Sequence, residues 1–210
     1  MTAEEYRKDP CRASSLPFWK TEGLRLPATL RVLREDAFSA ADCVGADEPY
    51  FKLIRGPEPP AVPRLPARFV SGAAEPEELA RHIASCYERE RVSAAELRAC
   101  RERPVYDPSL WLAVRERESG RIAASGIAEL DPRIGEGVLE WIQVSPDFRR
   151  EGLGRFVVGE LLRRMRGRAA FVTVSGRAGP DGPMGFYLAC GFRDPVIWHV
   201  VRTDARGGKG

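Results

Sequence analysis

A short, basic, glycine-containing segment is the part of the sequence best suited to bind an anion. Residues 149–155 read RREGLGR and follow a turn at Ser145-Pro146-Asp147 that ends a predicted strand. A helical pattern of apolar residues starts at Leu153, so the glycines lie at the beginning of a helix. The first turn of a helix has free N–H groups and the positive end of the dipole, and glycine lets a phosphate approach the backbone. The segment therefore predicts an anion site; a basic helix start with a tight turn is the alternative interpretation.

Two glutamates on neighbouring predicted strands are candidates for a general base. Glu140 begins a strand whose alternation places it on the same face as Ile142 and Val144, so its carboxylate has apolar neighbours. Partial burial there would make it a better proton acceptor. An exposed strand-end glutamate in a salt bridge is an equally open interpretation. Glu129 on the preceding strand is the second candidate, acting through a water, whereas His199, alone on a strand, is more typical of a structural histidine.

The composition is that of an ordinary globular protein and argues against several classes of function. Of the 210 residues, 43% are hydrophobic, which is enough for a core, and 33 basic and 30 acidic residues are interleaved to give a net charge of +3. Such a chain, without a basic tail, is not typical of a nucleic-acid-binding protein. No apolar run has the length of a membrane helix, and residues 1–10 are too charged for a signal peptide. We therefore expect a cytoplasmic protein without nucleic-acid or membrane partners.

The cysteines do not form a metal-binding or disulfide pattern. They are odd in number and widely spaced, at Cys11, Cys43, Cys86, Cys100 and Cys190. There is no CxxC pair, and the chain has only two histidines, so the sequence predicts no metal site. Free thiols in a reducing cytoplasm are the expected state.

The first third of the chain differs from the rest. Residues 1–27 contain three prolines and are expected to be irregular, with the aromatic segment SSLPFWK at 14–20 packing against a body elsewhere. Residues 29–33 and 50–54 are expected to be short strands that could pair with each other. Residues 56–66 (GPEPPAVPRLP) are nearly half proline and form a stiff linker. We therefore predict an extension at 1–66, a domain at 67–204 and a disordered tail at 205–210.

After the linker the periodicity alternates between strands and helices. We expect strands at 68–71, 110–115, 120–130, 138–144, 169–174 and 196–201, and helices at 76–88, 93–101, 153–165 and 184–189. Ser93 and Glu96 have the spacing of a capping box at the start of the second helix. Glu118-Ser119-Gly120 is expected to be the turn of a hairpin.

Two motifs in this order resemble those of the GNAT superfamily of coenzyme-A-dependent N-acetyltransferases. The family's pyrophosphate motif, Arg or Gln, two residues, Gly, any residue, then Gly or Ala, matches residues 149–154 (RREGLG) after a Val-Ser-Pro turn at 144–146. Its later aromatic motif matches residues 186–192 (FYLACGF). The resemblance implies an α/β (α+β) fold with a mixed, mostly antiparallel sheet flanked by helices.

The resemblance also implies roles for individual residues. Binding of acetyl-CoA is implied for the strand end and the loop, namely Ile142, Gln143, Val144, Arg149, Arg150, Glu151, Gly152, Leu153, Gly154 and Arg155. Tyr187 matches the position of the acid that protonates the departing thiolate; packing with the phenylalanines on either side is its alternative role. Pro180 stands where members often have asparagine, so any contact made from residues 179–183 is atypical.

The function implied by the resemblance is transfer of an acetyl group from acetyl-CoA to a primary amine by direct attack, with Glu140 or a water as base and Tyr187 as acid. The acceptor would be a small-molecule or peptide amine. A GNAT-fold module that binds acyl-CoA or a partner without chemistry is the alternative, and a dinucleotide site ranks below both because the three-glycine fingerprint is incomplete. The segment SSLPFWK resembles an extension of some bacterial members. The extension could cover the acceptor cleft, add strands to the sheet or join two copies of the chain as a homodimer.

Overall fold

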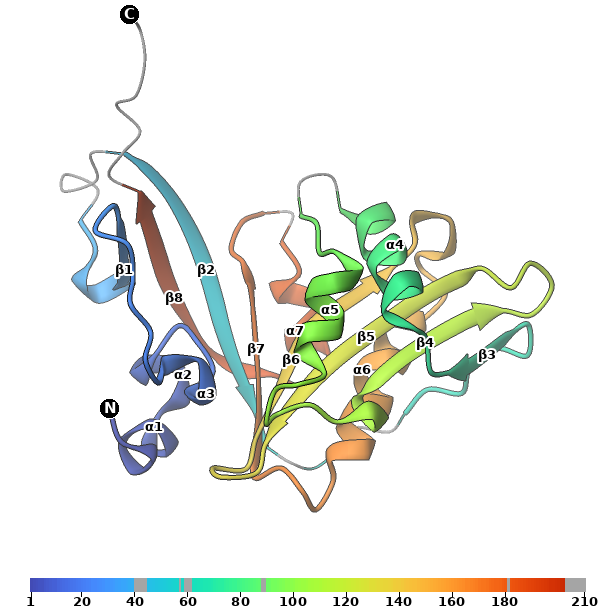
Figure 1. Ribbon diagram of the computed structural model, residues 1–210, viewed down its shortest axis with the longest axis horizontal. Coiled ribbons are helices and arrows are strands. Elements are labelled where there is room, and N and C mark those ends of the chain that lie inside the picture. Colours follow the sequence, from blue (N-terminus) through green and yellow to red (C-terminus); the bar gives the residue numbers. More distant parts are fainter. Residues whose placement is uncertain (40–44, 57, 59–61, 88–89, 181, 203–210) are drawn as a thin grey trace, which may run out of the picture. The chain divides into compact units, whose positions relative to one another are not determined.

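The computed structural model describes residues 1–39, 45–56, 58, 62–87, 90–180 and 182–202, and is shown in Figure 1. The chain divides into two compact units. Unit 1 consists of Met1–Arg55 and Thr173–Gly210, and unit 2 of Gly56–Val172. The two units are described separately below.

Unit 2 contains four antiparallel strands in the order β6-β5-β4-β3. Their bounds are β3 Phe69–Gly72, β4 Trp111–Glu116, β5 Ile122–Asp131 and β6 Glu136–Val144. The helices are α4 Pro76–Cys86, α5 Ala94–Cys100 and α6 Leu153–Met165, with short 3-10 turns η3 Pro108–Leu110 and η4 Pro146–Phe148. These elements confirm the strand and helix order predicted from residue 68 onward, including the capping box of Ser93 and Glu96.

The helices of unit 2 lie on opposite faces of its strands. Ile127 belongs to a buried cluster with side chains of α4 and α5. The preceding residue, Gly126, faces α6, because a Cβ atom there would lie 2.5 Å from Val157 Cγ1. Since neighbouring residues of a strand point to opposite faces, α4 and α5 cover one face and α6 the other, as Figure 1 shows. The glycine is what lets α6 pack so closely on β5.

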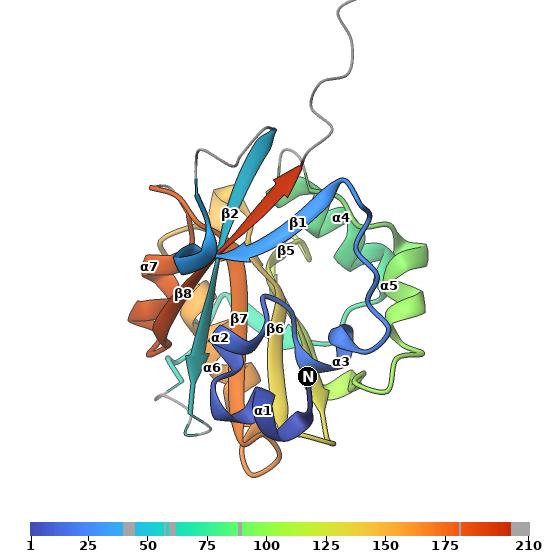
Figure 2. The ribbon, with the colours of Figure 1, turned by 90° about the vertical axis from the view of Figure 1, so that its left-hand side faces the viewer.

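Unit 1 is built around its last strand. Its strands are β1 Leu30–Arg34, β2 Ala46–Arg55, β7 Phe171–Arg177 (whose first two residues belong to unit 2) and β8 Arg193–Arg202. They follow the order β1-β8-β2-β7, with β1 and β2 both antiparallel to β8 (Figure 2). The prediction that residues 29–33 and 50–54 pair with each other is therefore wrong. Each of them pairs instead with a strand from the other end of the sequence.

The N-terminal segment is folded rather than irregular. It forms α1 Ala3–Lys8, α2 Pro10–Ala13 and α3 Phe18–Thr21, and η1 Glu35–Ala37 follows β1. A capping box between Thr2 and Glu5 begins α1. Tyr6 and Phe18 are buried with ring centroids 5.4 Å apart, so Phe18 packs against another helix of the same segment. The segment is thus part of the core of unit 1.

The chain has a mixed α/β fold with an eight-stranded, mostly antiparallel sheet flanked by helices, as predicted. Among the helices of the described residues, none is long and apolar enough to span a membrane. Four of the five cysteines are free thiols, and Cys43 lies outside the described residues. The predicted tail at 205–210 and part of the linker also lie outside them. The domain boundaries at 66 and 204 stay a prediction.

Candidate functional site

At the end of β6, some main-chain N–H and C=O groups point away from the neighbouring strand β5. The N–H of Ser145 donates to the carbonyl of Ala123 across 2.9 Å, so Ser145 and, two residues earlier, Gln143 direct their backbone groups to β5. Because the pattern of an antiparallel pair alternates, Ile142 and Val144 direct theirs to the opposite edge of β6. Of the predicted cofactor-binding residues, Ile142 and Val144 thus present main-chain groups at that edge, whereas Gln143 directs its backbone to β5.

A tyrosine hydroxyl already lies at this edge. Tyr87, the residue after α4, donates from its hydroxyl to the carbonyl oxygen of Ile142 across 3.4 Å. Its ring packs edge-on against Trp141, with centroids 5.9 Å apart. Burial raises the pKa of Tyr87 to about 12, so the hydroxyl keeps its proton near neutral pH and acts as a donor. Sequence analysis did not single out Tyr87.

Glu140 occupies a β-bulge in β6. Opposite β5, Ile127 pairs with Trp141 and Ala128 pairs with Leu139, so Glu140 is the extra residue between two regular pairs. Bulges re-aim a side chain and are frequent beside active sites. The simple alternation used to place Glu140 on one face with Ile142 is interrupted at this residue. The Glu140 side chain is partly exposed.

Glu129, the second candidate base, is engaged in an ion pair. It lies on β5 opposite Val138, is 4% exposed, and its Oε1 accepts from the Arg103 guanidinium across 2.9 Å. The Glu129 carboxylate is thereby held against Arg103, three residues after the end of α5. Glu129 is thus part of a partly buried ion pair, whereas Glu140 lies at a bulge and is partly exposed.

The loop after β6 is anchored by aromatic and ionic contacts. Phe148 of η4 is buried, packs edge-on against Phe69 at 5.9 Å between ring centroids, and has the guanidinium of Arg121 5.5 Å from its ring. Arg121 also pairs with Asp147 across 2.7 Å. Phe148 thus fixes the base of the loop on β3 and on the β4–β5 hairpin.

The tip of the loop has the backbone of an anion cradle. Arg150 and Gly152 both have left-handed conformations, with φ of 69° and 80°. Gly152 immediately precedes α6, whose first turn leaves the N–H groups of Leu153, Gly154 and Arg155 outside the helix's own hydrogen bonds.

The side chains around this cradle differ in role. Those of Arg149, Arg150 and Arg155 are exposed, whereas that of Leu153 is buried under the helix. The Glu151 carboxylate is ion-paired with Arg68, which leaves its backbone for the cradle. The loop can therefore surround an anion with N–H groups and three guanidinium groups.

Tyr187 lies in α7 Met184–Ala189 of unit 1 and packs within an aromatic cluster. The side chain is 6% exposed, and its ring centroid is 5.1 Å from Phe186, 5.8 Å from Phe192 and 6.1 Å from Phe51. Both roles considered from sequence, an acid and a packed aromatic, are compatible with these contacts. Glu140 and the loop belong to unit 2.

The sequence between Glu77 and Phe192 matches one family model, "Acetyltransferase (GNAT) family". This segment contains the bulge, the cradle and the aromatic motif, and it amounts to more than half of the chain. The chain belongs to the GNAT acetyltransferase family.

Solved structures support the GNAT fold at low sequence identity. A GCN5-related N-acetyltransferase from Sphaerobacter thermophilus is 19% identical, with a TM-score of 0.63, over 98% of this chain and 66% of that one. One from Kribbella flavida is 20% identical, with a TM-score of 0.51, over 85% and 68%. The ribosomal-protein-S18-alanine N-acetyltransferase of Escherichia coli is 18% identical, with a TM-score of 0.50, over 68% and 97%. This GNAT chain spans just under two thirds of the Sphaerobacter chain. No curated protein sequence matches it significantly.

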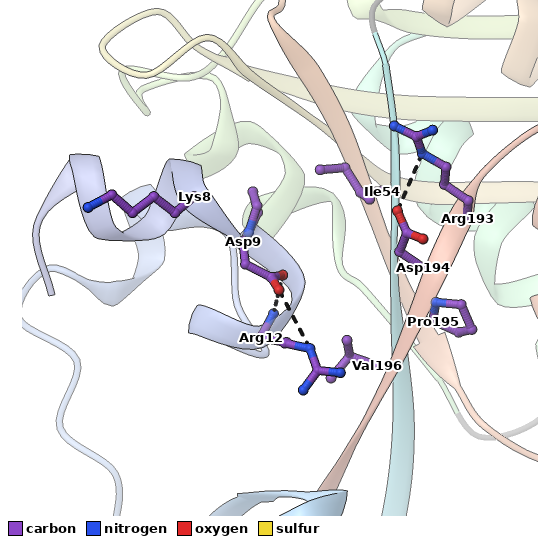
Figure 3. Close-up of a pocket in the computed structure, with 9 residues that line it drawn as sticks. Lys8, Asp9, Arg12, Ile54, Arg193, Asp194, Pro195 and Val196 are labelled. Atoms are coloured by element: carbon purple, nitrogen blue, oxygen red, sulfur yellow. Dashed lines mark hydrogen bonds and ion pairs between the residues drawn. The ribbon is translucent and has the colours of Figure 1, made fainter.

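One pocket of this GNAT chain is lined by residues other than the predicted site residues. In unit 1, a surface pocket of about 440 Å³ lies beside α2 and the start of β8. Its charged side chains pair with one another, Asp9 with Arg12 at 3.6 Å and Arg193 with Asp194 at 3.3 Å (Figure 3). None of the predicted site residues lines it. Among the described residues, no group of three or more His, Cys, Asp or Glu side chains could hold a metal ion.

A buried polar cluster at the start of the loop was missed by sequence analysis. His82 is 6% exposed and lies between the hydroxyls of Ser125 and Ser145, at 2.8 and 2.9 Å. Burial lowers the pKa of His82 to about 4, so the imidazole is neutral at physiological pH. The available signal was a histidine on the apolar side of a predicted helix, three residues after Leu79 and one before Ile83.

Proposed function

We propose that this GNAT protein is an N-acetyltransferase that moves an acetyl group from acetyl-CoA to a primary amine of a small molecule or peptide. The proposal rests on one observation, which is that the outer edge of β6 leads directly to the start of α6. The outward main-chain groups of Ile142 and Val144 lead, through Ser145 and η4, to the cradle at Gly152 and α6. An extended arm with amide groups and a diphosphate fits this arrangement.

The residues of the cradle fit a diphosphate. The N–H groups of residues 150–155 would surround its oxygens, and the side chains of Arg149, Arg150 and Arg155 would supply charge. The left-handed φ of Gly152 costs glycine nothing, and no other atom lies within 4 Å of where its Cβ would be, so the space belongs to a ligand or to solvent. When bound, acetyl-CoA supplies a thioester whose acetyl group is open to attack by an amine.

The remaining chemistry consists of two proton transfers, one to a group of this chain and one from a group of this chain. In direct attack the amine nitrogen forms a bond to the acyl carbon and the carbon–sulfur bond breaks. Glu140, directly or through a water, takes the proton that the amine loses. The Tyr187 hydroxyl gives a proton to the departing sulfur. A backbone N–H at the edge of β6 would stabilise negative charge on the acyl oxygen.

The test of this mechanism is Tyr187→Phe in an assay of thiol release from acetyl-CoA with a panel of primary amines. Loss of a general acid should lower kcat by at least about 100-fold, with KM for acetyl-CoA little changed. Tyr50→Phe, in the same unit, is the matched control and should retain the wild-type rate. An unchanged rate for Tyr187→Phe would remove Tyr187 from the mechanism.

A binding module without chemistry is the second candidate, favoured by the burial of Tyr187 among Phe51, Phe186 and Phe192. Thermal unfolding with added acetyl-CoA separates the two. Binding to the native state alone raises the midpoint temperature in both cases. Stabilisation without thiol release from any amine would favour the module, and no stabilisation would count against both.

A further inference from the structure

The buried cluster around His82 has one consistent direction of hydrogen bonding. The Ser145 hydroxyl donates to the carbonyl of Ile122 across 3.0 Å, so it must accept from His82 Nε2–H. His82 Nδ1 then has a lone pair and accepts from the Ser125 hydroxyl, which in turn accepts from the Gln143 amide. The partners fix the tautomer of His82 with the proton on Nε2.

This chain of hydrogen bonds joins four elements at the root of the loop. His82 is on α4, Ser125 on β5 and Gln143 on β6, while Ser145 immediately precedes η4. Side chains from helix and sheet therefore converge on the residue where β6 ends and the cradle's loop begins. The rest of the buried face of α4 is apolar, as at Leu79 and Ile83, so packing alone would not require a histidine here.

Cys86 lies on the same side of α4 as His82 and contacts it. Cys86 Sγ lies 3.6 Å from His82 Nε2, one turn later on α4. Burial raises the pKa of the Cys86 thiol, and hydrogen bonding with Ser85 and Ser145, followed by the positive charge of Arg149, opposes that rise. Arg149, the first residue of the RREGLG motif, thus lies within electrostatic range of the His82–Cys86 turn.

We propose that His82 is a positioning residue for the loop at residues 149–155. The neutral Nε2–H of His82 holds Ser145, so that this loop and the outer edge of β6 keep a fixed position relative to each other. This inference rests on the proposed function for its ligand, but the positioning itself is a property of the free protein. Ser125 bonds the same imidazole on the sheet side and provides a matched comparison.

The experiment compares Ser145→Ala with Ser125→Ala. Each removes one hydrogen bond to His82 and one to another group, the Ile122 carbonyl for Ser145 and the Gln143 amide for Ser125. Amide hydrogen exchange of residues 149–155 in the free protein, and titration calorimetry with acetyl-CoA, are the two measurements. Ser145→Ala should speed exchange in the loop and weaken acetyl-CoA binding between about 2- and 10-fold, the range for one hydrogen bond. Ser125→Ala should leave both at wild-type values.

Substitutions of His82 complete the test. His82→Leu should behave as Ser145→Ala in both measurements, and His82→Gln, whose amide can still donate to Ser145, should restore slow exchange and tight binding. Wild-type loop exchange in Ser145→Ala, or equal effects of the two serine substitutions, would overturn the inference. If the wild-type protein did not bind acetyl-CoA, the proposed function would fail, while the exchange measurement would still decide the role of His82.

Discussion

The ammonium group of Lys52 donates a hydrogen bond to the hydroxyl of Tyr6 across 2.8 Å in the interior of unit 1. The same group donates to the carbonyls of Pro10, Ser14 and Leu16 at 3.1, 2.9 and 2.8 Å. Lys52 is 1% exposed. One buried cation on β2 therefore binds carbonyl groups of α2 and of the turn that follows it, and connects the N-terminal segment to the sheet.

Lys52→Met should destabilise unit 1 strongly. Methionine fills a similar volume but removes the buried donor that the Tyr6 hydroxyl and three carbonyls share, at a cost of about 3 kcal/mol or more in the free energy of unfolding. Urea denaturation followed by circular dichroism measures the change. Lys8→Met is the matched control, because the Lys8–Glu4 pair is largely exposed and its loss should leave the midpoint in place. Wild-type stability of Lys52→Met would contradict this account of the segment.

The contrast between the two units shows what the sequence could predict. In unit 2, long periodic segments and local signals such as the Ser93–Glu96 box fix the elements without distant information. In the N-terminal part of unit 1, the helices α1 to α3 have only four to six residues, which is too short to show a period. Their packing on the sheet involves the hydrogen bonds of Lys52. The partner of β1 and β2 is β8, from the far end of the chain, and no local pattern encodes such a pairing.

The candidate site follows the same division. The loop at 149–154 was predicted because its chemistry depends on neighbouring residues in a fixed order. The bulge at Glu140 was not, since period-two alternation assumes a regular ladder and only the register with β5 shows the extra residue. His82 was missed because its partners, Ser125 and Ser145, come from a strand and a turn far along the sequence.

Gly191, the glycine of the aromatic motif at residues 186–192, is predicted to be required for two separate reasons. Gly191 has φ of 84°, and a Cβ there would lie 1.8 Å from Arg55 Nη1, which donates to the Cys190 carbonyl across 2.8 Å. Gly191→Ala should therefore lose more stability than the roughly 1 kcal/mol of left-handed strain alone. Thermal or urea unfolding measures the loss.

Gly120→Ala is the control for Gly191→Ala. Gly120 also has a positive φ, 69°, but no atom lies within 4 Å of its added Cβ, so only the backbone strain should appear. In Arg55→Ala/Gly191→Ala the close contact is gone, and the double variant should be more stable than the sum of the single effects allows. Equal losses for Gly191→Ala and Gly120→Ala would show that Arg55 does not constrain the site.

Stability should depend on pH through His82. Its pKa is about 4 in the folded chain against 6.5 for an unperturbed histidine, so between these values the unfolded state binds a proton that the folded state does not. The contribution is fully present above pH 6.5 and is lost progressively as the pH falls to 4, by up to about 3 kcal/mol. Urea unfolding at pH 7.5, 6 and 5 measures this slope.

His82→Gln isolates the effect, because all carboxylates titrate in both proteins. As the pH is lowered below 6.5, the unfolding free energy of wild type should fall more than that of His82→Gln. The variant should therefore gain stability relative to wild type. A difference that stays constant from pH 7.5 to 5 would mean that His82 keeps an ordinary pKa in the folded chain.

Substitutions of the two candidate bases, Glu140 and Glu129, are predicted to have different effects. Glu140→Gln removes a partly exposed carboxylate at the bulge and should lower kcat by about 100-fold or more. Glu129→Gln removes the partner of Arg103 and should instead lower stability, by about 1 kcal/mol since Arg103 is partly exposed. Steady-state thiol release and urea unfolding of both variants give the two readouts. Activity that survives in Glu140→Gln but is lost in Glu129→Gln would transfer the role of base to Glu129.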